Sequence, residues 1–179
     1  LFVSYASDEE VRSMKLWARE QAAGPAPHTA ALMIAQTLNE LGLEITVNAV
    51  PWPQMADQVW YKRLDEDTWD LTMWQMVSRP ERSDPDEFTY NLFHSSTAEK
   101  GYNFIGYVDP AFDALAEKQR VTMDPAARKE IIDQAQQNLA DAAANADLVH
   151  PLLNFAYDNS KFKEGSAVEQ GGLGSKKIW

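Results

Sequence analysis

The chain has 179 residues, of which 45% are hydrophobic, and this length suits one domain of ordinary size with one hydrophobic core. Its 16 Lys and Arg residues stand against 27 Asp and Glu residues, and the formal charge of −11 excludes binding to nucleic-acid phosphates or to anionic membrane surfaces. Cysteine is absent, which excludes disulfides, thiolate metal sites and cysteine nucleophiles, and the sequence holds no apolar run of about 20 residues that could span a bilayer.

The first part of the chain predicts strands and helices in alternation. Residues 1–5 read as a half-buried strand, and residues 8–20 have a loosely helical spacing of apolar side chains. After a Gly-Pro-Ala-Pro break, residues 28–41 follow the helical period, and Gly42 supplies a C-terminal stop. Residues 43–49 then alternate between apolar and polar side chains, which predicts a strand with one solvated face.

A second helix and strand follow. Pro53 begins a short helix that runs to Trp60, and residues 69–74 predict a strand that carries aromatic side chains and a methionine. Helix, strand, helix and strand in this order indicate a βαβ unit with a mixed or parallel sheet. Ligands of open α/β sheets lie beyond the carboxyl ends of the strands, so the stretch after Trp74 is where we expect a site.

Three Asp-Pro pairs predict the next helix starts. Asp accepts hydrogen bonds from the free N–H groups of a first turn, and Pro fits the following position because no N–H is needed there. The helices expected from these pairs cover residues 84–93, 109–119 and 124–144.

The end of the chain sets the predicted domain boundaries. Residues 148–155 resume a strand, and beyond Asn159 the sequence is polar and rich in glycine. We therefore predict a single α/β domain over residues 1–159. Residues 160–179 are expected to be a polar tail or a crossing segment to a further part of the protein.

The second half of the chain also carries several short motifs whose order and spacing are more specific than any one of them. They are Trp74 at a strand end, Ser83-Asp84-Pro85-Asp86-Glu87-Phe88, Leu92-Phe93-His94-Ser95, the run from Asn103 to Leu115, and Asp124 with Arg128 and Gln134-Ala135-Gln136. In these residues the sequence resembles the second lobe of the bacterial extracellular solute-binding proteins of the peptide/nickel ABC-importer class (family 5). The resemblance covers most of the chain and is strongest between Trp69 and Phe155.

The resemblance implies a fold, partners and a location. The chain is expected to be one lobe of a periplasmic-binding-protein-like (type II) α/β fold, a mixed sheet flanked by helices, with residues 160–179 leading to the absent lobe. In the intact protein, two lobes enclose a peptide-like, oligosaccharide or other small polar solute and present it to the membrane complex of an ABC importer. The expected location is periplasmic or extracellular, membrane-associated through the importer, and neither catalysis nor a cofactor is expected.

The stretch after Trp74 departs from the pattern of peptide-binding relatives. In those relatives an acidic residue a few positions after the Trp typically holds the ammonium group of the ligand. Here Gln75 follows, and no acidic residue occurs up to Arg79, which counts against an ordinary peptide ligand. Arg79 and Arg82, with a stacking Trp74, would suit carboxylate, phosphate or hydroxyl-bearing ligands, because a guanidinium offers a planar fork of donors.

Two residues of a later loop complete the predicted site. Asn103 could orient a ligand with both a donor and an acceptor, or it could simply hold its own loop. Tyr107 could line a ligand cleft or belong to the core. With Trp74, Gln75 and Arg79, these residues form the cleft side of the lobe that we predict.

The alternative is a free-standing α/β hydrolytic or metal-binding domain. His94 lies beside Ser95 and Ser96, but no nucleophile elbow or phosphate-binding glycine loop accompanies it. His28, His94 and His150 show no paired metal-ligand spacing. We therefore predict no catalytic residue and no metal ligand. A further expectation is self-association through the apolar face that a missing lobe would leave.

Overall fold

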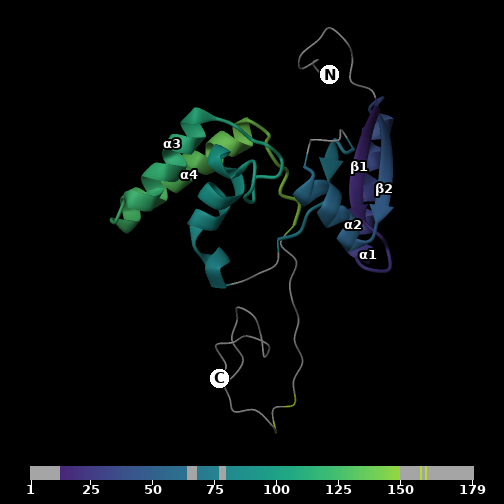
Figure 1. Cartoon of the computed structure of the whole chain (residues 1–179), viewed down its shortest axis with the longest axis horizontal. Coiled ribbons are helices and arrows are strands. Elements are labelled where there is room, and N and C mark those ends of the chain that lie inside the picture. Colours follow the sequence, from purple (N-terminus) through teal and green to yellow (C-terminus); the bar gives the residue numbers. More distant parts are fainter. Residues whose placement is uncertain (1–12, 64–67, 77–79, 150–157, 159, 161–179) are drawn as a thin grey trace. The chain divides into compact units, whose positions relative to one another are not determined.

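The computed structural model describes residues 13–63, 68–76, 80–149, 158 and 160 (Figure 1). These residues divide into two compact units. Unit 1 takes the described residues up to Gln75 together with Phe104–Gly106, and unit 2 takes those from Met76 to Asn103 and from Tyr107 onward. The single domain over residues 1–159 stays a prediction.

Unit 1 is built on a small parallel sheet. Its strands β1 (Ser13–Arg19), β2 (Glu44–Val50) and β3 (Leu71–Thr72) lie in the order β2-β1-β3. Both ladders are parallel. The predicted strand over residues 43–49 is confirmed, and the one over residues 69–74 is confirmed in a shorter form.

The predicted helix over residues 8–20 is wrong for residues 13–19, which form strand β1. Leu16 and Ala18 pack into one hydrophobic cluster, and Trp17 between them packs into another. A central strand that is buried on both faces has no alternation of apolar and polar residues, so its sequence does not distinguish it from a helix.

Helix α1 (Pro25–Glu40) covers one face of the sheet. It begins three residues before the predicted start at His28, since Pro25 occupies a first helical position, where a missing N–H costs nothing. Buried Ala31 and Ala35 let the helix pack closely on Leu16 and Ile45. The predicted stop is confirmed, because Gly42 has a φ of 97°, which L side chains rarely adopt.

The other face of the sheet packs on α2 (Trp52–Met55), which continues as the π-helical turn Ala56–Tyr61. The core here consists of Trp17, Met55, Val59, Trp69 and Phe104. Two indole N–H groups also donate to backbone carbonyls, from Trp17 to Thr68 at 2.9 Å and from Trp69 to Arg63 at 2.7 Å. These bonds satisfy polar atoms that the apolar core would otherwise leave without partners.

Strand β2 is an edge strand of the described sheet. The carbonyl of Val50 accepts a hydrogen bond from the N–H of Glu20, just beyond β1, so even-numbered residues of β2 direct their backbone groups toward β1. Odd-numbered residues then direct theirs outward, because these groups alternate along a strand. At Ile45 the outward N–H donates to the side-chain oxygen of Asn39, at 2.7 Å.

Unit 2 is helical in its described part. It contains the 3₁₀ turns Pro80–Ser83 and Ser95–Thr97, the π-helical turn Glu87–Asn91, and the adjacent helices α3 (Pro110–Val121) and α4 (Pro125–Asp141). Its buried apolar residues are Phe93, Phe112, Ala116, Ile131, Ile132, Ala135 and Leu139.

The predicted helix starts of unit 2 are confirmed. Asp109 accepts hydrogen bonds from the N–H groups of Ala111 and Phe112, and Asp124 accepts one from Ala127. Asp84 likewise accepts from the N–H of Asp86 at 2.9 Å.

Two terminal predictions fall outside the described residues. The strand over residues 1–5 is one, and the tail over residues 160–179 is the other, apart from Ser160. Of the strand predicted over residues 148–155, Leu148 and Val149 are described, and they have no regular secondary structure. Among the helices of the described ranges, none is long and apolar enough to cross a bilayer.

Candidate functional site

The three strands of unit 1 end beside one another. Arg19 is the last residue of β1, Trp52 lies two residues after β2, and Trp74 lies two residues after β3. Because the strands are parallel, these positions belong to the same carboxyl edge of the sheet. Ligands of open parallel sheets bind beyond this edge.

Aromatic side chains form a connected cluster at this edge. The rings of Trp52 and Trp74 have centroids 4.9 Å apart, and the ring of Trp74 is 5.5 Å from Trp60 and 4.8 Å from Phe104. The guanidinium carbon of Arg19 lies 4.2 Å from the centroid of the Trp52 ring, a cation–π contact. We call Arg19, Trp52, Trp60, Trp74 and Phe104 the tryptophan platform.

The tryptophan platform has a buried base and an exposed part. Phe104 is 5% exposed and lies within 5.8 Å of Trp60, whereas Trp52 is 37% exposed. An exposed indole backed by further rings offers a rigid apolar surface on which a flat or apolar group can stack, at little cost in side-chain entropy. A guanidinium beside it adds a planar set of donors.

The structure places only some of the predicted site residues around Trp74 at the tryptophan platform. Trp74 is half-buried within the tryptophan platform, and Gln75 next to it is exposed. Arg79 lies outside the described residues. Arg82 belongs to unit 2, and its Nε lies 3.5 Å from a carboxylate oxygen of Glu87, so its guanidinium already has an acidic neighbour.

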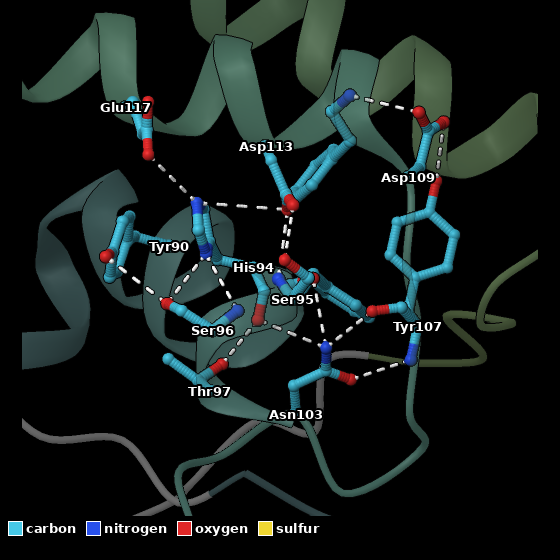
Figure 2. A network of polar contacts seen from close by, with 12 residues as sticks. Tyr90, His94, Ser95, Ser96, Thr97, Asn103, Tyr107, Asp109, Asp113 and Glu117 are labelled. Atoms are coloured by element: carbon cyan, nitrogen blue, oxygen red, sulfur yellow. Dashed lines mark hydrogen bonds and ion pairs between the residues drawn. The ribbon is translucent and has the colours of Figure 1, made fainter. Parts of the chain in front are cut away.

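Asn103 is fully buried in unit 2, where it holds the backbone of its loop. Its side-chain nitrogen donates to the carbonyls of Phe93, His94 and Tyr107, and its side-chain oxygen accepts the N–H of Tyr107 at 2.9 Å (Figure 2). These bonds perform the loop-holding role. A contact between Asn103 and a ligand stays a prediction.

Tyr107 is half-buried and takes part in a polar contact with α4. Its hydroxyl donates to the side-chain oxygen of Asn138 at 2.8 Å. The hydroxyl also lies 3.3 Å from a carboxylate oxygen of Asp109 (Figure 2). Burial, together with the negative charge of Asp109, raises the pKa of Tyr107 to about 12. The hydrogen bond from Asn138, followed by the bond from the N–H of Ala111, lowers the pKa of Asp109. Ligand contact by Tyr107 also stays a prediction.

His94 and its serine neighbours form a structural network (Figure 2). Nδ1 of His94 accepts the N–H of Ser96 at 3.1 Å and lies 2.8 Å from the Ser96 hydroxyl, so the ring caps the turn Ser95–Thr97. The ring is 5% exposed and stacks on Tyr90 at 4.2 Å. On the other side of the ring, Nε2 lies 3.5 Å from a carboxylate oxygen of Glu117 and 3.9 Å from one of Asp113.

This network does not favour the hydrolytic or metal-binding alternative. The serine hydroxyl closest to the imidazole belongs to the turn that the imidazole caps, and burial keeps the ring from a substrate. In the part of the chain that the structure describes, no group of three or more potential ligands is arranged to hold a metal ion.

Arg19 and Trp52 were not among the residues that the sequence predicted to line the site. Both could have been found by applying the carboxyl-edge rule to every strand, as it was applied to the strand before Trp74. For Arg19, that step required β1 to be recognised as a strand. The three consecutive buried residues Leu16, Trp17 and Ala18 break the alternation expected of a strand and concealed it.

No family model matches the sequence. The chain is 30% identical over 129 residues to di/tripeptide-binding protein 4 of Pseudomonas aeruginosa, covering 72% of this chain and 23% of that protein. It is also 30% identical over 149 residues to the probable ABC transporter periplasmic-binding protein SapA of Escherichia coli, covering 81% of this chain and 26% of that protein.

A solved structure shows the same fold. The periplasmic binding protein DppA from Helicobacter pylori, in complex with the peptide STSA, matches with a TM-score of 0.63 at 18% identity, over 78% of this chain and 25% of that chain. The described fold is therefore that of one lobe of a periplasmic binding protein, as the sequence predicted.

The particular class follows from the sequence relatives. These relatives and the structural neighbours are solute-binding proteins of the peptide/nickel class (family 5), and most of the chain is similar to a part of them. The chain spans about a quarter of the length of the curated relatives named above, 23% and 26%. These relatives are named as binding proteins, in agreement with the prediction that the chain is not an enzyme.

Proposed function

We propose that the chain is a ligand-binding lobe of an extracellular solute-binding protein, which captures a peptide-like, oligosaccharide or other small polar solute for an ABC importer. The observation that carries this proposal is the tryptophan platform at the carboxyl edge of the sheet. The relatives support a binding role, since one is named as a di/tripeptide-binding protein and another as a probable periplasmic-binding protein of an ABC transporter.

The geometry of the tryptophan platform suggests how a solute would bind. A flat or apolar part of the solute stacks on the exposed indole of Trp52, and the tilted ring of Trp74, with its centroid 4.9 Å away, packs against that indole. The exposed Gln75 is available for a hydrogen bond. A single open surface encloses only part of a ligand, so we expect the isolated chain to bind weakly and a second lobe to complete the enclosure.

The remaining predicted residues are proposed to have two different roles, direct contact with the solute and support of a loop. Arg79, a few positions beyond Trp74, is proposed as a direct contact. Asn103 and Tyr107 are proposed to shape the loop between them, since their hydrogen bonds fix the backbone there. The proposed location is the periplasm or the cell surface, with the importer complex as the partner.

The indole N–H signals of the tryptophans in a two-dimensional proton–nitrogen NMR spectrum test this proposal. Titration of the chain with di- and tripeptides and with oligosaccharides should shift the signals of Trp52 and Trp74. The signals of Trp17 and Trp69 serve as internal controls, because both groups are buried and hydrogen-bonded to backbone carbonyls. Assignment follows from single Trp→Phe variants.

A double variant provides the second arm of the test. Trp52→Ala with Trp74→Ala should abolish the binding measured by ligand-observed NMR. Tyr61→Ala is the matched control, because Tyr61 is an aromatic residue of the same unit that is 75% exposed and has no ring contact with the tryptophan platform among the described residues. Unchanged indole signals at millimolar ligand, or equal losses in both variants, would contradict the proposal.

A further inference from the structure

We propose that the outer edge of strand β2, together with the groove between β2 and α1, binds an extended basic segment of a partner protein. This surface belongs to unit 1 and shares no residue with the tryptophan platform. The proposal goes beyond the capture of a solute, because it concerns a second surface and a protein partner.

The first observation is the row of backbone groups along the outer side of β2. Even-numbered residues of β2 direct their backbone groups toward β1, so Val47 and Ala49 direct both their N–H and their C=O outward. Among the described residues, no strand lies beyond β2 (Figure 1). A segment of another protein can therefore add to the sheet by pairing with these groups.

The second observation is a groove of about 590 Å³ that runs beside this edge. It is lined by two residues of β2 and five of α1, namely Ile45 and Val47 together with Leu32, Ala35, Gln36, Asn39 and Glu40. Leu32 is 49% exposed, although its helix packs on the sheet. Every second side chain of a strand added to β2 would face α1, so the groove provides room for those side chains.

The third observation limits the length of the pairing. The outward N–H of Ile45 is already bonded to the side chain of Asn39 at 2.7 Å, which leaves the carboxyl half of β2 for a partner. In an antiparallel pair, one residue exchanges both of its backbone bonds with the residue opposite, and this recurs at every second position. The outward groups of Val47 and Ala49 therefore suit a short antiparallel segment.

The fourth observation is charge, which decides between possible partners. Glu40 lines the groove, and Glu44, the first residue of β2, is exposed. Among the described residues that line the groove, none is Lys or Arg. A second copy of the chain carries the same net charge of −11 and would be repelled, whereas a segment with Lys or Arg would be attracted.

The side chains of the partner follow from this register. Residues directly opposite each other in an antiparallel pair share one face, so the residue opposite Val47 faces the groove, as do those opposite Ala49 and Ile45. Apolar residues suit the positions opposite Ala49 and Val47. Basic residues suit the positions opposite Ile45 and Glu44, where the acids lie. From its amino end, the segment then reads apolar, polar, apolar, polar, basic, basic.

The acetylated and amidated peptide Val-Thr-Val-Thr-Lys-Lys has this pattern and no charged terminus. Added to the full chain, it should shift the backbone amide signals of Val47 and Ala49 in a proton–nitrogen NMR spectrum, slow their hydrogen exchange, and leave the indole signals of Trp52 and Trp74 in place. The same peptide ending in Glu-Glu should bind about tenfold more weakly, because two attractive charge pairs become repulsive. N-methylation of both valines should abolish binding, since they lose the N–H groups that pair with β2.

Two pairs of variants assign the effect. Ala49→Pro removes an outward N–H and keeps the side of β2 that pairs with β1, so it should weaken binding several-fold, and Ala49→Thr, which keeps the N–H, is its control. Glu40→Lys should remove most of the preference for the Lys-Lys peptide. Glu130→Lys makes the same change of net charge at an exposed position of α4 and should leave the preference intact. Unchanged indole signals of the buried Trp17 verify that each variant is folded.

Three results would overturn the proposal, and none of them depends on whether the tryptophan platform binds a solute. Slow exchange of the Val47 and Ala49 amides before any peptide is added would mean that another segment of the chain already covers the edge. Shifts confined to the indole signals of Trp52 and Trp74 would assign the peptide to the solute site. Equal binding of the Lys-Lys and Glu-Glu peptides would exclude selection of a basic partner.

Discussion

Asn103 is fully buried, and its side chain organises the backbone around it. Replacing Asn103 with Ala removes donors from buried carbonyls at Phe93, His94 and Tyr107 and an acceptor from the N–H of Tyr107. We expect Asn103→Ala to lower the free energy of unfolding by about 3 kcal/mol, because buried polar groups lose their partners. Urea denaturation measures this loss.

The control for this substitution is Asn145→Ala. Asn145 is exposed, and its side-chain nitrogen donates to Asp147 at 2.9 Å, so its loss should change the free energy of unfolding by less than about 0.5 kcal/mol. Comparable small effects of both substitutions would show that Asn103 does not hold the loop.

Tyr107 makes stability depend on pH in the alkaline range. Its pKa is raised to about 12 in the folded chain, whereas an unfolded tyrosine ionises near pH 10. Between these values the unfolded chain has lost the proton that the folded chain keeps, so the contribution of Tyr107 to stability is present below pH 10 and falls as the pH rises toward 12. We expect Tyr107→Phe to remove the part of the alkaline loss of stability that the ionisation of Tyr107 causes.

The measurement compares urea unfolding of the unsubstituted chain and Tyr107→Phe at several pH values from 8.5 to 11. The other tyrosines are common to both proteins, so they cancel in the difference. Parallel curves over this range would contradict an elevated pKa at Tyr107.

At the scale of elements, the end of α1 depends on backbone conformation. Gly42 has a φ of 97°, and a Cβ added to it would meet nothing within 4 Å. Gly42→Ala should therefore lower the free energy of unfolding by about 1 kcal/mol through backbone strain alone. Gly24→Ala is the control, because Gly24 has a φ of −163°, which every residue adopts. Thermal unfolding should rank Gly42→Ala as the less stable protein, and the reverse order would argue against strain at Gly42.

Elements whose boundaries have local causes were predictable from sequence. The helices of unit 2 begin at Asp109 and Asp124 because the cap is made by the residue itself. Strand β1 was not predictable, because its state depends on partners that pack against Leu16 and Trp17 from opposite faces. The residues of the candidate site show the same difference between local causes and causes that depend on the whole sheet. Trp74 was found from its own strand, but Arg19 became visible only when the parallel register placed β1 beside the other strand ends.

At the scale of the whole molecule, charge is the dominant feature. A net charge of −11 on 179 residues produces self-repulsion that opposes the compact state. We expect the melting temperature to rise by a few degrees when the ionic strength increases from about 0.01 to 0.3 M, since the Debye length then falls well below 10 Å. Differential scanning calorimetry in NaCl and in KCl measures this change, and sucrose at equal osmolality controls for solute exclusion. A fall in melting temperature in both salts would mean that attractive ion pairs outweigh the repulsion.

The hydrogen bond from the N–H of Ile45 to Asn39 limits how the edge strand β2 can pair with a strand of another molecule. An exposed strand edge is a template on which another chain can add a strand, and such growth leads to fibrils. By occupying the outward N–H of Ile45, Asn39 shortens the pairing surface of β2 to the backbone of Val47 and Ala49. Asn39→Ala should lengthen that surface and hasten thioflavin-positive aggregation under agitation, and an unchanged lag time would argue against it. The side-chain amide of Asn39 thus protects this edge against strand addition by a second copy of the chain.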